Sequence, residues 1–123
     1  MQSNEEGDYL SQSDISSQML KGIFQGCLLL LINHQPYYGY AISQELSKYG
    51  FTDVPKGTIY PLLMNMEKKG LIVGKTKPSK EGPQRKYYYI TSTGKQARKT
   101  FLTQWANLSL NVNGLINERR NDQ

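Results

Sequence analysis

The stretch Gly57-Thr58-Ile59-Tyr60-Pro61-Leu62-Leu63 is typical of the beginning of a helix, which the apolar spacing extends to Lys69-Gly70. Two strand-like runs follow at 71–77 and 85–91, separated by a segment rich in turn formers at 78–84. A helix followed by a hairpin is the pattern of a winged helix-turn-helix. In that fold the helix enters the major groove of DNA and the hairpin, or wing, lies along the phosphates.

The start of this helix can be placed in two ways. If the helix begins at Thr58, Pro61 lies in its first turn, where the missing N–H has no cost. A start nearer Pro55 would place a kink at Pro61. In either case an apolar stripe faces the core, made of Ile59, Leu62, Leu63 and Met66. The outer faces then carry Tyr60, Pro61, Met64, Asn65, Lys68 and Lys69.

The positive charge of the chain is concentrated around this unit. Residues 56–99 hold eleven of the 15 Lys and Arg but only two acids, Glu67 and Glu81. Residues 1–14 are acidic, and the chain of 123 residues has a net charge of +5. Clustered cations favour double-stranded DNA as the partner, although a solvated basic face with no partner is the alternative.

The candidate DNA-binding residues are polar, basic or aromatic, and they lie on the helix, on the wing and just before the second helix. Tyr87 and Tyr89 should share one face of their strand, and Tyr88 should point the other way. Stacking of tyrosines on single-stranded bases is a rival interpretation. The predicted contacts to DNA are Tyr38, Tyr40, Lys56, Thr58, Tyr60, Asn65, Lys75, Lys77, Lys80, Arg85 and Lys86.

Two further helices are expected before this unit. The first spans about 15–34, with Ser13 or Asp14 as its cap. Apolar residues recur every four positions along it: Ile15, Met19, Ile23 and Cys27. It becomes apolar on nearly all sides toward Ile32, which predicts the centre of the core. The second runs over about 39–48, with Ile42 and Leu46 facing inward and Gly50 as a left-handed cap.

A long helix should close the chain. Thr93 and Gln96 have the spacing of a capping box, and the helix is expected to reach about Asn117. An apolar seam with heptad spacing runs along it: Phe101, Trp105, Leu108, Val112 and Leu115. Exposed apolar surface costs about 25 cal/mol per Å², so a partner helix in a homodimer is predicted to cover the seam. Packing of this helix on the first helix is the alternative, and both arrangements can coexist.

Several classes of protein are disfavoured by the sequence. The single histidine, His34, lacks partners with the spacing of a catalytic triad, and no metal-binding or phosphate-cradling motif is found, so neither a metal, a cofactor nor an enzyme is expected. A single cysteine, Cys27, fits a reducing compartment. Its expected role is that of a buried small apolar side chain, with a reactive thiol as the alternative. The apolar run at 27–32 is too short to cross a bilayer. A soluble, cytoplasmic protein is expected.

The predicted fold class is therefore mainly α with a small two-stranded β wing. We expect a flexible acidic tail at 1–14, a winged helix-turn-helix domain at 15–92, and a C-terminal dimerisation helix and tail at 93–123.

Three motifs in order give the chain a family resemblance. The segments Pro36-Tyr37-Tyr38-Gly39-Tyr40, Gly57-Thr58-Ile59-Tyr60-Pro61-Leu62-Leu63 with Glu67-Lys68-Lys69-Gly70-Leu71-Ile72, and Arg85-Lys86-Tyr87-Tyr88-Tyr89-Ile90-Thr91 closely resemble the PadR family of bacterial transcriptional regulators. The likeness covers about residues 19–116. It implies a homodimeric winged-helix repressor with a C-terminal dimerisation helix. Met64 and Asn65 stand where basic residues are common in the family.

Trp105 acquires a second interpretation from this resemblance. Some small members of the family are similar to multidrug sensors, in which aromatic residues of the C-terminal helix line a pocket at the dimer centre. Two facing Trp105 side chains could sandwich a small planar aromatic ligand. Plain packing in the seam is the alternative. The predicted function is a repressor of a palindromic operator that an aromatic effector releases. A winged-helix protein-interaction module without operator recognition is the other hypothesis.

Overall fold

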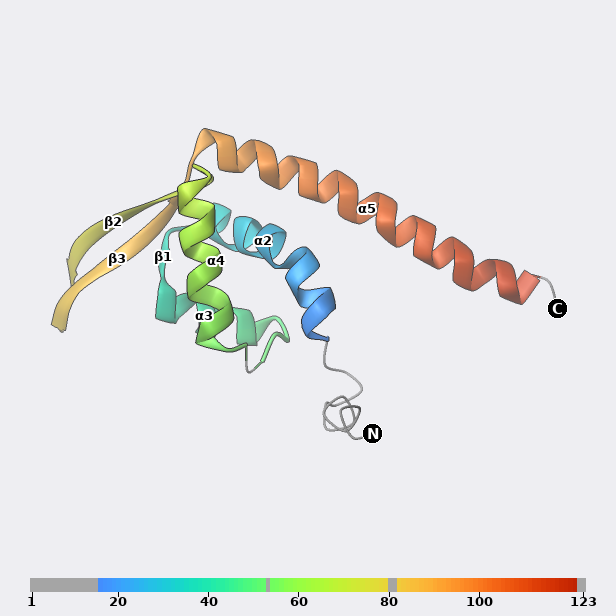
Figure 1. Cartoon of the computed structure of the whole chain (residues 1–123), viewed down its shortest axis with the longest axis horizontal. Coiled ribbons are helices and arrows are strands. Elements are labelled where there is room, and N and C mark those ends of the chain that lie inside the picture. The colour runs from blue at the N-terminus through green and yellow to red at the C-terminus, as the bar shows by residue number, and fades with distance from the viewer. Residues whose placement is uncertain (1–15, 53, 80–81, 122–123) are drawn as a thin grey trace.

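The computed structural model describes residues 16–52, 54–79 and 82–121 (Figure 1). The elements of this part, in chain order, are α2 (Ser17–His34), β1 (Tyr37–Tyr38), α3 (Gly39–Lys48), α4 (Lys56–Lys68), β2 (Ile72–Ser79), β3 (Gly82–Ile90) and α5 (Ser92–Asn121). The mainly helical winged fold is confirmed. The expected acidic tail and the expected caps Ser13 and Asp14 lie outside the described residues.

Helix α2 forms the centre of the core, as predicted, but not with the face that its spacing suggested. Ser16 caps the helix, its hydroxyl oxygen accepting from the Met19 N–H at 3.2 Å. The predicted stripe is not the buried one, because Met19 is 65% exposed and Ile23 and Cys27 are only half-buried. The fully buried side chains of α2 are instead Phe24, Leu28, Leu29 and Ile32.

Helices α3 and α4 pack against this core through the side chains that the sequence predicts. Ile42 and Leu46 of α3 are buried, as are Ile59, Leu63 and Met66 of α4, while Leu62 is partly buried. Each of these side chains contributes about 1.5–3 kcal/mol by leaving water. The left-handed residues Gly50 (φ +97°) and Gly70 (φ +77°) follow the two helices and turn the chain, a conformation that costs glycine little.

The beginning of α4 follows the earlier of the two predicted starts. Pro55 is its cap and Lys56 its first residue, so Pro61 lies inside the helix rather than in its first turn. Proline there lacks the N–H that would bond to the preceding turn. The outer residues of α4 are exposed, as expected: Tyr60, Pro61, Met64, Asn65, Lys68 and Lys69.

The sheet has three strands rather than the predicted two, in the order β1-β3-β2. The short strand β1 pairs antiparallel with β3, with Tyr37 opposite Tyr88 and Tyr38 opposite Tyr87. The wing is also longer than predicted, because strands β2 and β3 include Pro78, Ser79, Gly82, Pro83 and Gln84, which the sequence assigned to a turn.

The residue that caps helix α5 lies two positions earlier than predicted, and the helix ends later, at Asn121. The residue that caps it is Thr91, not Thr93: the Thr91 hydroxyl oxygen accepts from the Gly94 N–H at 3.0 Å. The same hydroxyl donates to the Gly70 carbonyl oxygen at 2.6 Å, so the start of α5 is tied to the end of α4. The helix then passes along α2 and continues away from the body to Asn121, on the side opposite the wing (Figure 1).

Candidate nucleic-acid interface

The outer face of the wing combines cations with tyrosine rings. In the register of β2 and β3, Lys75 lies opposite Tyr87 and Lys77 opposite Arg85, and such cross-strand partners share one face of a sheet. Lys77 Nζ lies 5.8 Å from the centre of the Tyr87 ring and 5.1 Å from that of Tyr89. Lys75 Nζ lies 5.2 Å from the Tyr89 ring. These cation–π contacts hold the lysines over the strand without neutralising them.

Strand β1 widens this face with a further tyrosine. The Arg85 guanidinium stacks over the Tyr38 ring at 4.3 Å, and the Tyr38 and Tyr87 rings meet edge to face at 5.4 Å between centroids. A cation–π contact of this kind does not neutralise the guanidinium or use up its N–H donors. Tyr38 therefore supports a cation that can still pair with a phosphate.

Lys86 does not belong to the outer face, although the sequence grouped it with Arg85. Neighbouring residues of a strand point to opposite sides, and Tyr88, on the same side as Lys86, is buried in the core. Lys86 Nζ donates to Glu67 Oε1 of α4 at 3.0 Å. That hydrogen bond raises the pKa of the Lys86 ammonium above its ordinary value. In this structure the Lys86 ammonium is therefore paired with the Glu67 carboxylate.

The beginning of α4 brings a second set of predicted residues together. Lys56, the first residue of the helix, is exposed, and its ammonium lies 5.7 Å from the centre of the Tyr40 ring at the start of α3. Thr58 is half-buried, and Asn65 is exposed about one turn beyond Pro61. The free N–H groups of a helix N-terminus favour anions such as phosphate, and Lys56 adds to that field.

Tyr60 is held between the two helices rather than fully free. A Cβ at Gly39 would overlap the Tyr60 ring, so the ring packs directly on the backbone where α3 begins. The side chain is still 37% exposed. It lines an open groove of about 380 Å³ between α3, α4 and the wing, which Tyr38, Tyr40, Arg85 and Lys86 also line. This groove joins the start of α4 to the wing.

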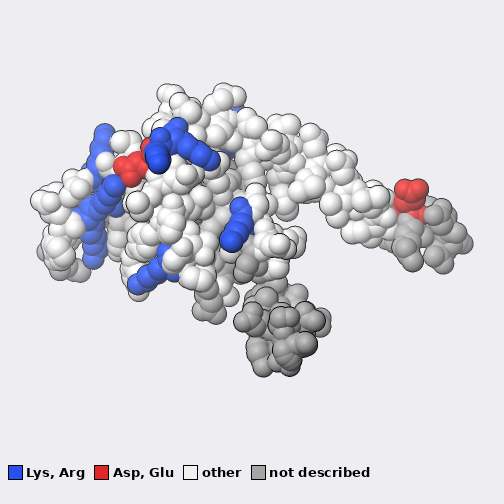
Figure 2. All heavy atoms as spheres, viewed as in Figure 1, with Lys and Arg blue, Asp and Glu red and all other residues white. Residues whose placement is uncertain are grey.

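The fold brings five of the predicted residues together around the groove, namely Tyr38, Tyr40, Tyr60, Arg85 and Lys86. Lys75 and Lys77 lie instead on the outer face of the wing, and Thr58 and Asn65 are not part of the groove lining. Lys80 lies outside the described residues. Figure 2 shows lysines and arginines over the wing and near α4, whereas the visible shaft of α5 is largely free of charge up to an acidic group near its end.

The apolar seam of α5 is buried only where the helix crosses α2. Phe101 is half-buried there, with its ring against Gly26. Farther along, Trp105 is 48% exposed, Leu108 50%, Val112 45% and Leu115 72%. The predicted packing of α5 on α2 is observed at one end of the helix, and most of the seam is uncovered in the single chain.

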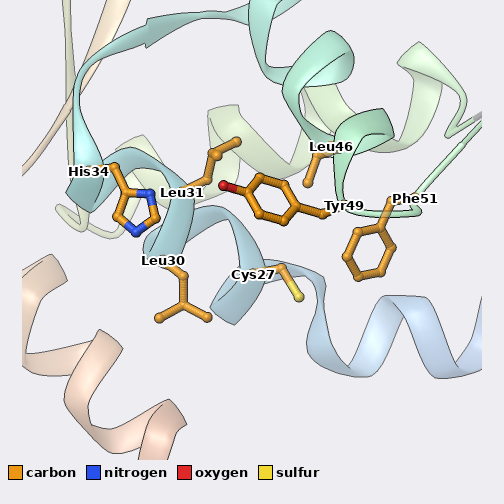
Figure 3. A pocket seen from close by; sticks show the side chains of 7 residues that line it. All are labelled: Cys27, Leu30, Leu31, His34, Leu46, Tyr49 and Phe51. Carbon is orange, nitrogen blue, oxygen red and sulfur yellow. The ribbon is translucent and has the colours of Figure 1, made fainter.

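A second apolar surface was not predicted from the sequence. Beside α2 and the end of α3 lies a hollow of about 290 Å³, in which Cys27, Leu30 and His34 face Tyr49 and Phe51 (Figure 3). Burial raises the pKa of the Cys27 thiol, consistent with a packing role rather than a reactive one. The only hint in the sequence was the all-round apolar character of residues 27–32, which leaves α2 with apolar side chains on its solvent side.

Two observations bear on other classes of function. Within the described ranges, no group of three or more His, Cys, Asp or Glu side chains could hold a metal ion. None of the helices that the structure describes is long and apolar enough to cross a membrane.

The fold and the basic surface define a winged-helix protein of the DNA-binding class, and comparison with known proteins identifies the family. Residues 28–100 match the Transcriptional regulator PadR-like family, and the chain belongs to that family. It is therefore a DNA-binding regulator of transcription and not an enzyme.

Solved structures of transcriptional regulators agree with this assignment, and the chain also resembles one uncharacterised curated protein. A PadR-like transcriptional regulator from Bacillus cereus is 48% identical, with a TM-score of 0.74 over 81% of this chain and 97% of that one. A Streptococcus transcriptional regulator is 41% identical, with a TM-score of 0.74 over 81% and 98% of the two chains. An uncharacterised protein of Lysinibacillus sphaericus is 33% identical over 94 residues, which are 75% of this chain and 86% of the relative.

Proposed function

We propose that the protein is a repressor that binds a palindromic operator as a homodimer. The observation that carries this proposal is the uncovered seam of α5, because an apolar stripe of this length is unfavourable in water. The hollow beside α2 is a second apolar surface that a partner chain can cover (Figure 3). A two-fold dimer would present two copies of α4, which suits a site of two half-sites about one DNA turn apart.

Within each half-site, α4 would read bases and the wing would hold the backbone. Tyr60 lines the groove, whereas Thr58 and Asn65 lie on another flank of α4; from there these side chains would reach base edges. Lys56 at the helix start and Lys75, Lys77 and Arg85 on the wing supply cations for phosphates. Tyr38 and Tyr40 each support one of these cations with an aromatic ring.

We further propose that a small planar aromatic compound binds at Trp105 and releases the operator. Trp105 is the only tryptophan, and nearly half of its surface is exposed at mid-helix. In a symmetric dimer it would lie near its own copy, and two indoles can hold a flat ligand by stacking. A ligand there would favour a different separation of the two α4 helices and lower operator affinity through that change.

A mobility-shift assay tests this function. The probe is a duplex from the region upstream of the protein's own gene, with a shuffled duplex of equal length and composition as its matched control. The proposal expects one complex with the mass of a dimer on the first duplex, at concentrations that leave the second free. Planar aromatic compounds should dissociate the complex with the first duplex. Equal binding to both duplexes would favour the other hypothesis, a protein-interaction module without operator recognition.

A further inference from the structure

Glu67, in the last turn of α4, touches both strands of the wing. Its Oε2 accepts a hydrogen bond from the backbone N–H of Gly74 on β2 at 3.2 Å. Its Oε1 accepts from the ammonium of Lys86 on β3 at 3.0 Å. One side chain therefore joins the end of the reading helix to each strand of the hairpin.

The sequence leaves room for this bridge at Gly74. A Cβ at that position would overlap the end of the Lys86 side chain and lie 3.1 Å from Glu67 Oε2. Without a side chain, Gly74 lets the Lys86 stem cross β2 and reach the carboxylate. The pair is partly shielded, with the Glu67 side chain 31% exposed and that of Lys86 48% exposed.

The geometry of the wing gives the bridge a consequence for DNA binding. A two-stranded hairpin that extends beyond the core is weakly held and twists readily. The outer face with Lys77 and Arg85 can meet phosphates while α4 sits in the groove only if the hairpin keeps one angle to α4. The bridge holds the wing beside Lys77 and Arg85, which pair with each other one position beyond the pair of Thr76 and Lys86, so it fixes the position of these two cations relative to α4.

We infer that Glu67 is a positioning residue for operator recognition, which fixes the angle between α4 and the wing. This inference rests on the proposed function, in which both elements contact one half-site. A carboxylate next to a DNA-binding surface repels phosphates, so plain electrostatics predicts tighter binding to any DNA when Glu67 is removed. Positioning predicts the opposite for the operator.

The test uses these opposite signs. The full-length wild-type protein first selects a preferred duplex from a random library, and dissociation constants are then measured for that duplex and for a shuffled one. Glu67→Ala should bind the selected duplex about tenfold more weakly, within the usual range of coupling between sites. Its affinity for the shuffled duplex should be equal or higher. Glu67→Gln, whose amide oxygen can still accept from Gly74, should fall between Glu67→Ala and the wild type.

Glu45 offers a matched control. Its carboxylate pairs with Lys48 Nζ at 2.7 Å within α3, so Glu45→Ala removes the same charge without touching the wing. That variant should keep the wild-type ratio of the two affinities. The exchange Glu67→Lys with Lys86→Glu restores the ion pair but not the bond to Gly74, and should recover part of the ratio lost in Glu67→Ala.

The outcomes separate the inference from the function on which it rests. If the wild type prefers no duplex, the proposed operator function fails and the inference fails with it. If the wild type shows a preference and both Glu67 variants keep that ratio, only the positioning role is overturned. Equal weakening on both duplexes would indicate a purely structural role and would also overturn it. Thermal melts identify the variants that are folded at the assay temperature. If Glu67→Ala is unfolded, the affinity ratio of Glu67→Gln tests the positioning role.

Discussion

The Phe101 ring packs directly on Gly26, so that α5 approaches α2 at a point where α2 carries no side chain. A methyl group at Gly26 would overlap the ring and push the two helices apart. Gly26→Ala should lower the free energy of unfolding by about 1–3 kcal/mol, as overpacked cores do. Gly22 is the matched control, because a Cβ there has nothing within 4 Å and alanine favours the helix. Thermal or urea unfolding of both variants measures the difference, and a Gly26→Ala variant as stable as Gly22→Ala would contradict this packing.

The seam of α5 should control assembly. Leu115→Asp places a charge in the apolar surface that the dimer would bury, and should produce a monomer at micromolar concentration. Asn113→Asp adds the same charge on the other side of the helix and should leave the dimer intact. Sedimentation equilibrium of the two variants is the measurement.

Truncation after Lys99 should likewise give a monomer of poor solubility, and a well-folded dimer of that truncated chain would refute the assignment.

Trp105 fluorescence should report the proposed effector. Planar aromatic dyes at about tens of micromolar should quench the emission, because a stacked ligand lies against the indole. The same dyes should lower operator affinity. Trp105→Ala should lose dye binding, and Trp105→Phe, which keeps a smaller ring, should bind more weakly than the wild type. Unchanged emission in the wild type, or equal dye binding by Trp105→Ala measured by dialysis, would assign the residue to packing alone.

Substitutions in the wing and in α4 should change DNA binding in different ways. Arg85→Ala removes a cation that the Tyr38 ring holds outward, so affinity should fall to a similar degree for all DNA sequences. Thr58→Ala and Tyr60→Ala should instead change which sequences are selected from a random library. Lys48→Ala, at the end of α3 that lies away from Tyr40, is the control for loss of positive charge. A change of sequence preference in Arg85→Ala would reverse the assigned roles of the two elements.

The parts of the fold set by local periodicity could be predicted from the sequence. Helix α3 has the expected bounds, and the buried stripe of α4 is as expected, because polar and apolar residues alternate clearly along both. Helix α2 is apolar on nearly all sides, so spacing alone could not indicate that Phe24 and Leu28 point to the core and Met19 does not. Only packing against the other helices decides this.

Pairing between distant segments was harder to predict. Strand β1 has two residues and no pattern of its own, and it exists because Tyr37 and Tyr38 lie beside β3. Pro78 suggested a turn, but β2 is an edge strand with an irregular register between Lys77 and Ser79, where a missing N–H is tolerated. Similarly, Thr91 caps α5 because it also reaches the Gly70 carbonyl oxygen, a contact that no capping motif encodes.

The candidate site, like the fold, could be predicted from the sequence only in part. Residue types and charge predicted a basic surface rich in tyrosine on the wing and α4, and the structure brings five of the predicted residues together around one groove. The separate roles of Arg85 and Lys86 follow only from the folded structure: the two residues are adjacent in sequence, yet one lies over the Tyr38 ring and the other pairs with Glu67.

The salt dependence of operator binding tests the central claim, that cations of the wing and α4 hold DNA phosphates, most directly. Dissociation constants of the wild-type dimer for its selected duplex would be measured at several salt concentrations. If about six to eight phosphates are neutralised per dimer, the logarithm of the association constant should fall against that of salt with a slope of about −5 to −7. Arg85→Ala should make this slope shallower. A slope near zero would contradict the account.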